Sequence, residues 1–293
     1  MKILVTGSTG GIGQFVVKRL LEAGHTLRTM DITAQPTGVG YEHFPGDIRN
    51  LPLVRQLAQG MDAIVHLAAI PYDVDRQDEL ILDTNIHGTW NVLMAAHEAG
   101  VKRVVNFSSI NALGHAEPKR PGLYLPLDDE LPHFPVRNYP LSKHIGEELC
   151  YAFAARGAFS VVSLRPTLVT YPGPSHFPWF RNMPEEMKIQ FGMRDLFSYV
   201  DVRDVAEAAL LGLTAEVNLH QAFLLAADDN HFHIPTAELV EKYLPNLPWP
   251  KVSKEEYLAK GEFVSLLDCR AAKQVLGWQP KYSEFDPSAG YVH

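Results

Sequence analysis

The chain has 293 residues, of which 46% are hydrophobic and 20% charged, and its formal net charge is −8. This composition is that of an ordinary globular protein, and the length suits one large α/β domain with a smaller lobe attached. Binding to phosphate backbones depends on clustered cations, and no run of lysine and arginine occurs, so nucleic acid and an anionic membrane are excluded as partners. No signal peptide or membrane helix is predicted, and we expect a cytoplasmic protein. The two cysteines and thirteen histidines form no metal-ligand pattern, so no metal is expected.

Short β-rich runs alternate with longer helical patterns over the first two-thirds of the chain. This alternation is typical of a parallel sheet covered by helices and predicts an α/β, doubly wound fold. In chain order, strands are expected at residues 2–5, 27–31, 41–44, 63–67, 103–107 and 160–164. Helices are expected at residues 12–23, 51–59, 80–99 and 141–155, the first ended by Gly24 and the third by Gly100.

The first strand leads into a glycine-rich segment that opens a helix, Thr6-Gly7-Ser8-Thr9-Gly10-Gly11-Ile12-Gly13. Glycines spaced three apart permit a tight turn, close approach of the backbone to a pyrophosphate, and close packing of helix on sheet. The free N–H groups and the macrodipole at the helix N-terminus favour such an anion. The order of strand, glycines and helix predicts a Rossmann-type dinucleotide site at Gly7, Gly10, Gly11, Ile12 and Gly13.

Asp31 ends the second strand, 18 positions after Gly13. An acid near that distance accepts hydrogen bonds from the ribose hydroxyls and repels a 2′-phosphate, so we expect NAD rather than NADP. Arg28 lies nearby and is the one feature that weakens this preference. The segments Gly46-Asp47-Ile48 and His66-Leu67-Ala68-Ala69 follow the next two strands, and their small residues would let the backbone approach the cofactor. Taken singly, each segment fits packing as well as binding.

Tyr139 and Lys143 are four positions apart, so on a helix their side chains share one face. Moving a hydride between a carbon and a nicotinamide requires a proton to leave or join the oxygen on that carbon. A free tyrosine has a pKa of about 10, and a neighbouring lysine together with the positive nicotinamide ring lowers it. Ser109 follows the strand at 103–107, and its hydroxyl can hold the substrate oxygen against the tyrosine. Asn85, within the helical stretch at 80–99, is structural on the residues alone.

Two proline-dense stretches, residues 118–140 with six prolines and residues 166–184 with five, are predicted to be ordered loops. Both follow strands of the predicted sheet, and ligands bind outside the carboxyl ends of such strands. We therefore expect an NAD-binding domain at residues 1–165, with its core continuing through about 198–225. Residues 166–197 and 226–293 would form a small C-terminal substrate-binding lobe.

These residues resemble the extended short-chain dehydrogenase/reductase family, often called the NAD-dependent epimerase/dehydratase group. The resemblance runs from Met1 to about Pro280 and includes Leu164-Arg165-Pro166 and the segments at 199–206 and 276–280. It implies that Asp47 and Ile48 flank the adenine and that Ser109 is the catalytic serine. It also implies that Asn85 organises a water or the active-site helix, that Tyr139 is the acid/base, and that Lys143 binds the nicotinamide ribose and tunes the tyrosine. We expect substrate contacts from Ile110, Asn111, Arg165 and His176.

Three departures from the family pattern narrow the substrate. Ile110 and Asn111 stand where sugar-nucleotide dehydratases carry an Asp-Glu pair, so dehydration is disfavoured. Leu113-Gly114 replaces the Tyr-Gly of many nucleotide-sugar enzymes, and the span from Arg165 to Tyr199 is short for a lobe that clamps a nucleotide-sugar. In these respects the chain is similar to uronate dehydrogenases, which oxidise a free sugar acid.

The sequence therefore predicts an NAD-dependent oxidoreductase or epimerase that acts at a hydroxyl or carbonyl carbon of a sugar or nucleotide-sugar. A dehydrogenase of a free sugar acid is the alternative, and a non-catalytic NAD-sensing regulator is the alternative of another class. The motifs do not separate an epimerase, which keeps its cofactor bound, from a dehydrogenase, which releases NADH. Family resemblance also implies a homodimer through the helices at 80–99 and 141–155.

Overall fold

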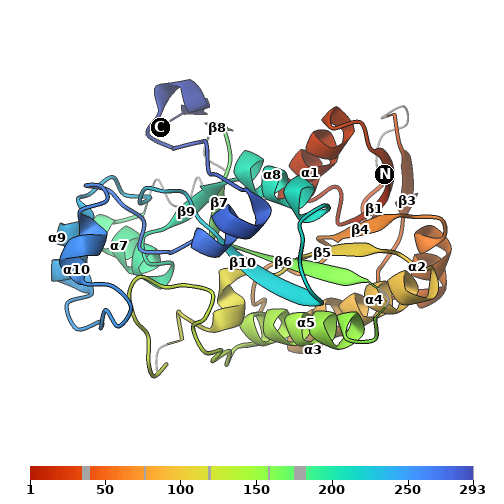
Figure 1. Ribbon diagram of the computed structural model, residues 1–293, viewed down its shortest axis with the longest axis horizontal. Coiled ribbons are helices and arrows are strands. Elements are labelled where there is room, and N and C mark those ends of the chain that lie inside the picture. The colour runs from red at the N-terminus through yellow and green to blue at the C-terminus, as the bar shows by residue number, and fades with distance from the viewer. Residues whose placement is uncertain (35–39, 76, 118–119, 158, 175–182, 293) are drawn as a thin grey trace.

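The computed structural model describes residues 1–34, 40–75, 77–117, 120–157, 159–174 and 183–292. Its centre is a seven-stranded sheet with the strand order β10-β6-β5-β4-β1-β2-β3, and all neighbouring strands are parallel (Figure 1). The strands are β1 (Lys2–Thr6), β2 (Thr26–Asp31), β3 (Glu42–Pro45), β4 (Ala63–His66), β5 (Arg103–Phe107), β6 (Ser160–Pro166) and β10 (His220–Leu225). The order reverses between β1 and β4, where a doubly wound sheet binds its ligands.

Helices cover both faces of this sheet. On one face lie α1 (Gly11–Glu22) and α8 (Val202–Gly212), and on the other lie α2 (Leu51–Ala58), α4 (Gly88–Glu98) and α5 (Asn138–Ala154) (Figure 1). The pleat of β1 shows why: Ile3 and Val5 belong to the apolar cluster under α1 and α8, whereas Leu4 points into the cluster under α2, α4 and α5. The predicted fold class, an α/β Rossmann-type doubly wound sheet, is confirmed.

The C-terminal elements gather at one end of the molecule, on the left in Figure 1. They include α7 (Glu185–Arg194), α9 (Thr236–Tyr243) and α10 (Lys254–Leu258). Two small parallel sheets accompany them, one of β7 (Leu168–Thr170) with β9 (Tyr199–Asp201), the other of β8 (Gly173–Pro174) with β11 (Tyr291–Val292). The buried Trp278 anchors the closing segment, because its indole N–H donates to the carbonyl of Asp204 on α8 at 2.8 Å.

The local patterns placed most elements up to residue 165 correctly, but they missed the elements beyond it and differ in some of the earlier ones. The helix expected at 80–99 is α3 (Asp78–Leu82), a π-helical turn η1 (Asp83–His87) and α4 in succession. The helix expected from Leu141 begins at Asn138 and has Pro140 in its first turn. Proline is tolerated there because the first N–H groups of a helix have no intrahelical acceptor. The proline-dense stretch at 166–184 contains the short strands β7 and β8, and β10 adds a strand that was not predicted. In the described ranges, no helix is long and apolar enough to cross a membrane.

Candidate active site

The glycine-rich loop has no room for a side chain at Gly7 or at Gly13. A Cβ on Gly13 would lie 2.1 Å from the carbonyl oxygen of Gly7, and a Cβ on Gly7, whose φ is +75°, would lie 2.6 Å from the backbone nitrogen of Ala68. The start of α1 therefore packs directly against the ends of β1 and β4. The backbone of Leu67 and Ala68 lies beside the loop.

The same loop has the donors that a phosphate requires. Gly10 is the N-cap of α1, no side chain caps the helix, and no acidic residue lies in its first turn. The N–H groups of Gly11 and Ile12 thus belong to the helix end that has no intrahelical acceptor. The hydroxyl of Ser8 is buried without a hydrogen-bond partner among the described residues. These features fit the pyrophosphate of a dinucleotide.

Asp31 lies beside this loop and helps to shape it. One carboxylate oxygen accepts a hydrogen bond from the backbone of Thr9 at 3.0 Å, and the other accepts from the backbone of Thr33 at 3.1 Å. The Arg28 guanidinium is engaged elsewhere, since it donates to the carbonyl of Leu57 and pairs with Glu42. A carboxylate without a neighbouring cation suits ribose hydroxyls better than a phosphate.

The segment that is expected to flank the adenine is held by backbone and ionic contacts. The Asp47 carboxylate binds the Arg49 guanidinium, with Nη2 at 2.6 Å, and this hydrogen bond lowers the pKa of Asp47. Ile48 is buried under α4, where its side chain occupies the space that a Cβ on Gly88 would fill. The Asn91 amide donates to the carbonyl of Ile48 at 3.0 Å, which fixes the path of this loop.

Tyr139, Lys143 and Ser109 come together at the carboxyl end of β5. The first two lie on one face of α5, and the Lys143 ammonium is 5.8 Å from the centre of the Tyr139 ring. The Ser109 side chain interacts with the Tyr139 phenol closely enough to lower its pKa, and Lys143 Nζ donates to the carbonyl of Phe107, on β5, at 2.7 Å. The three groups that the sequence assigns to catalysis thus converge.

The protein's own charges keep Tyr139 neutral near pH 7. Burial raises the pKa of Tyr139 to about 12, the interaction with the Ser109 side chain opposes this, and the charges of Asp73 and Asp195 raise the pKa further. Burial also lowers the pKa of Lys143 to about 8, against the effect of Glu147. Proton abstraction by Tyr139 therefore needs positive charge beyond what Lys143 provides in this arrangement.

Asn85 positions the active-site helix. It lies in the π-helical turn η1, a distortion common at functional sites. Its side chain accepts a hydrogen bond from the backbone N–H of Ile70 at 2.8 Å and donates to the carbonyl of Ile70 at 3.0 Å. It also donates to the Ser142 hydroxyl at 3.0 Å, and Ser142 donates to the carbonyl of Tyr139. Of the two roles that the resemblance implies for Asn85, the contacts fit the organisation of the helix.

The four residues expected to touch substrate have different surroundings. Asn111 lies at the site, because its backbone and side-chain N–H groups donate to Ser109 Oγ at 3.2 and 3.3 Å. The Ile110 side chain is instead buried in the main apolar core. His176 lies outside the described residues. Ile110 belongs to a tight 3-10 turn, η2 (Ile110–Leu113), and its contact with substrate stays a prediction.

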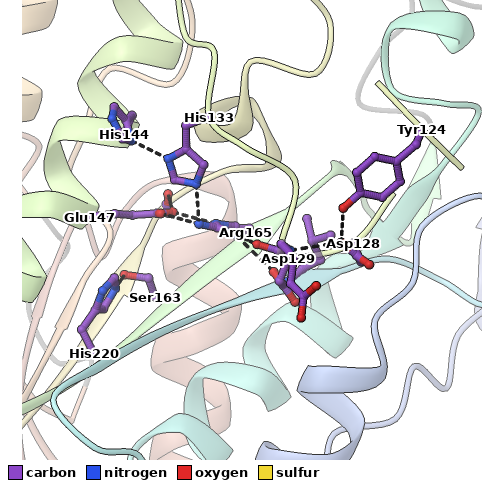
Figure 2. A network of polar contacts seen from close by, with 12 residues as sticks. Tyr124, Asp128, Asp129, His133, His144, Glu147, Ser163, Arg165 and His220 are labelled. Atoms are coloured by element: carbon purple, nitrogen blue, oxygen red, sulfur yellow. Dashed lines mark hydrogen bonds and ion pairs between the residues drawn. The ribbon is translucent and has the colours of Figure 1, made fainter. Parts of the chain in front are cut away.

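Arg165 has several partners inside the protein. Its guanidinium is buried and donates to Glu147 at 2.6 and 2.9 Å, to Asp129 at 3.3 Å and to His133 at 3.0 Å (Figure 2). These contacts give the guanidinium a structural role, and its contact with substrate stays a prediction. Sequence reasoning missed Glu147, although its position one turn after Lys143 on α5 was the available signal.

The fold and the converging tyrosine, lysine and serine define a nicotinamide-dependent oxidoreductase architecture of the Rossmann class. The model of the NAD dependent epimerase/dehydratase family matches residues 3–225, and the chain belongs to this family. Membership confirms the resemblance given by the sequence and the expectation of NAD as cofactor.

Individual relatives differ in their activities. The chain is 32% identical over 166 residues to a uronate dehydrogenase of Pseudomonas syringae pv. tomato; the alignment covers 56% of this chain and only 58% of that protein. It is 26% identical to a UDP-glucose 4-epimerase of Streptomyces lividans, covering 97% of this chain and 92% of the relative. Among solved structures, MoeE5 in complex with UDP-glucuronic acid and NAD matches with a TM-score of 0.71 at 23% identity, covering 99% of this chain and 97% of that one. This last likeness concerns the fold.

We expect Asp31→Ala to relax the choice of cofactor. The substitution removes the acceptor for the ribose hydroxyls and the charge that repels a 2′-phosphate, so the ratio of the NADP to the NAD dissociation constant should fall about tenfold or more. Titration with both cofactors measures this ratio. Asp31→Asn is the matched control, because it retains an oxygen for the Thr9 N–H and separates charge from loop geometry. An unaltered ratio in both variants would remove Asp31 from the ribose site.

We expect Arg165→Met to lower the free energy of unfolding by about 3–5 kcal/mol, because it leaves Glu147 buried without its cation. Urea denaturation gives the value. Arg19→Met, which breaks a partly exposed ion pair with Glu207, is the control and should cost about 1 kcal/mol or less. Unchanged stability together with weaker sugar binding in Arg165→Met would return this residue to the substrate site.

Proposed function

We propose that the protein is an NAD-dependent oxidoreductase that transfers a hydride at a hydroxyl-bearing carbon of a sugar. The observation that carries the proposal is the convergence of Tyr139, Lys143 and Ser109 at the carboxyl end of β5: Lys143 Nζ lies 5.8 Å from the centre of the Tyr139 ring, and the Ser109 side chain acts on the pKa of the Tyr139 phenol. A hydroxyl carbon held there has an acid/base group and a hydrogen-bonding hydroxyl at its oxygen.

In this proposal each residue has a distinct role. Ser109 and the Tyr139 phenol orient the substrate oxygen, and Tyr139 takes its proton as the carbon is oxidised. Bound NAD supplies the acceptor for the hydride and, through its positive ring, charge that favours the phenolate. Lys143 binds the nicotinamide ribose, and Asn85 holds α5 in place. The cofactor contacts are Gly7, Gly10, Gly11, Ile12, Gly13, Asp31, Asp47, Ile48, Leu67, Ala68 and Ala69.

The proposed division of labour follows the two parts of the chain. Residues 1–165 and about 198–225 would bind NAD, and residues 166–197 and 226–293 would select the sugar. A cytoplasmic location and a homodimer through residues 80–99 and 141–155 belong to the same proposal, since the sequence and the family resemblance support them. A purely NAD-sensing regulator would not require Ser109, Tyr139 and Lys143 to converge.

Within this function we favour a free sugar acid as substrate. The similarity to uronate dehydrogenase supports it. Ile110 supports it further: where the family's dehydratases carry an acid, this chain has a buried apolar side chain that performs no elimination. The alternative, epimerisation of a nucleotide-sugar, is supported by the longer alignment with UDP-glucose 4-epimerase.

We expect NADH to accumulate when the protein is given NAD with D-glucuronate or D-galacturonate, because a net oxidation releases the reduced cofactor. NADH fluorescence measures this product. Interconversion of UDP-glucose and UDP-galactose without NADH, followed by chromatography, would make the protein an epimerase instead. Absence of both reactions would contradict the oxidoreductase proposal.

We expect Tyr139→Phe to lower the turnover number by roughly 100- to 10,000-fold, because the variant has no group to take the proton. The dissociation constant for NAD should stay within about threefold of that of the wild type, since the phenol is not needed to hold the dinucleotide. Tyr151→Phe is the matched control, because Tyr151 lies on the exposed side of the same helix. Full turnover in Tyr139→Phe would disprove the acid/base assignment.

A further inference from the structure

His115 is a buried histidine whose ring has unsatisfied hydrogen-bonding capacity. It follows the turn η2 and Gly114, and its side chain is 1% exposed. Neither Nδ1 nor Nε2 has a hydrogen-bond partner in the part of the chain that the structure describes. A neutral imidazole has one donor and one acceptor, and burial of both without partners opposes folding. Such a group is expected to meet a ligand or a catalytic partner.

The nearest charged group to this ring is Asp195, which comes from the C-terminal part of the chain. Its Oδ1 lies 3.7 Å from His115 Nε2, beyond the length of a direct hydrogen bond. Asp195 ends α7 and is followed by Leu196 and Phe197, both with positive φ, of 51° and 56°. Both of these residues are buried, and the Phe197 N–H donates to the carbonyl of Gly192 at 2.7 Å. The strained turn is thereby held rigid, and the carboxylate with it.

Each member of the pair has a link to the proposed reacting groups. The charge of the Asp195 carboxylate acts to raise the pKa of the Tyr139 phenol. His115 follows Ser109 by six residues, on the segment that leaves β5, and Asn111 within that segment donates to the Ser109 hydroxyl. The imidazole and the carboxylate thus approach each other from opposite parts of the chain beside the proposed site of oxidation.

The chemistry of the pair points to one kind of ligand group. An oxygen that joins His115 Nε2 and Asp195 Oδ1 must accept from an N–H and donate to a carboxylate, and a hydroxyl does both. A carboxylate cannot donate, and the charges of Asp195 and Asp73 would repel it. An ammonium cannot accept. An alcohol oxygen is therefore the complementary group.

We propose that His115 and Asp195 bind a free hydroxyl of the substrate, on the carbon next to the one that is oxidised, and so select polyhydroxylated sugars over deoxy sugars. The inference rests on the proposed function and deepens it. It makes both residues determinants of substrate specificity, with no part in proton transfer, because Tyr139 and Ser109 already serve the reacting oxygen.

The test compares D-glucuronate with 2-deoxy-D-glucuronate, which lacks the hydroxyl beside C1, the carbon that a uronate dehydrogenase-like reaction oxidises. We expect the wild type to have a kcat/KM about tenfold or more higher for D-glucuronate, because the deoxy sugar leaves both polar groups unpaired. His115→Phe keeps the bulk of the ring and should lose most of this preference. We expect its kcat/KM to fall for D-glucuronate and to stay unchanged for the deoxy sugar. Asp195→Asn should act in the same direction, and His115→Asn, which retains a donor and an acceptor, should recover part of it.

His97→Phe is the matched control, since His97 on α4 also has a buried ring nitrogen without a partner among the described residues, yet lies in the helical layer. We expect it to leave the preference unchanged. If His115→Phe and Asp195→Asn prefer D-glucuronate over the deoxy sugar as strongly as the wild type does, the inference is overturned. Turnover of D-glucuronate in that case would leave the proposed function intact.

A binding measurement separates the two proposals. D-Glucuronate is titrated by calorimetry into the NAD complex of Tyr139→Phe, with and without His115→Phe. Suppose that the double variant binds D-glucuronate more weakly than Tyr139→Phe does, and that the wild type releases no NADH. This result would support the hydroxyl site and refute the oxidoreductase proposal. Equal binding in the two proteins, or none in either, would overturn the hydroxyl site. Circular dichroism of each variant establishes that its fold is intact.

Discussion

The buried guanidinium of Arg165 is the contact on which the site depends. From β6 it binds the Glu147 carboxylate on α5 (Figure 2). Glu147 also accepts a hydrogen bond from the hydroxyl of Ser108, the residue before Ser109. One carboxylate therefore fixes the helix that bears Tyr139 to the strand end that bears Ser109. Burial acts to raise the pKa of Glu147, but its bonds to Arg165 outweigh this and lower it, so the group stays ionised. Without its cation, a carboxylate this deeply buried would be costly.

A second set of contacts fixes the opposite end of α5. The Asp73 carboxylate accepts the backbone N–H of Tyr139 at 2.7 Å, which satisfies one of the donors that a helix leaves unpaired at its start. Asn85 reaches the same turn through Ser142. The helix is thus anchored at its first turn and again two turns later. Because the helix is held in place, the Tyr139 phenol and the Lys143 ammonium keep a fixed position relative to each other. Catalysis by proton transfer requires such a fixed geometry.

The sequence predicted features that depend on residues close together in the chain, and it missed contacts between residues that are far apart in it. The strands, the glycine loop and the pairing of Tyr139 with Lys143 depend on neighbours along the chain, and periodicity reveals them. The sequence did not reveal the partners of Arg165, because Glu147, Asp129 and His133 come from other segments, and the proline-dense sequence of 118–140 gives no register for the last two. The pairing of His115 with Asp195 joins the segment after β5 to the end of α7, so no local pattern announces it.

The charges around Tyr139 explain why the base and the cofactor belong together. Burial and two carboxylates hold the phenol in its protonated form, and the Lys143 ammonium is directed at the carbonyl of Phe107. Because the pKa of Lys143 is lowered to about 8, its own charge is only partly retained above neutrality. The polypeptide therefore does not produce a phenolate by itself, and a cation at the nicotinamide position would be the missing contribution. With Tyr139 as the proposed base, such an arrangement would keep it protonated until a positively charged ring lies beside it, so that a proton would be removed only when a hydride acceptor is present.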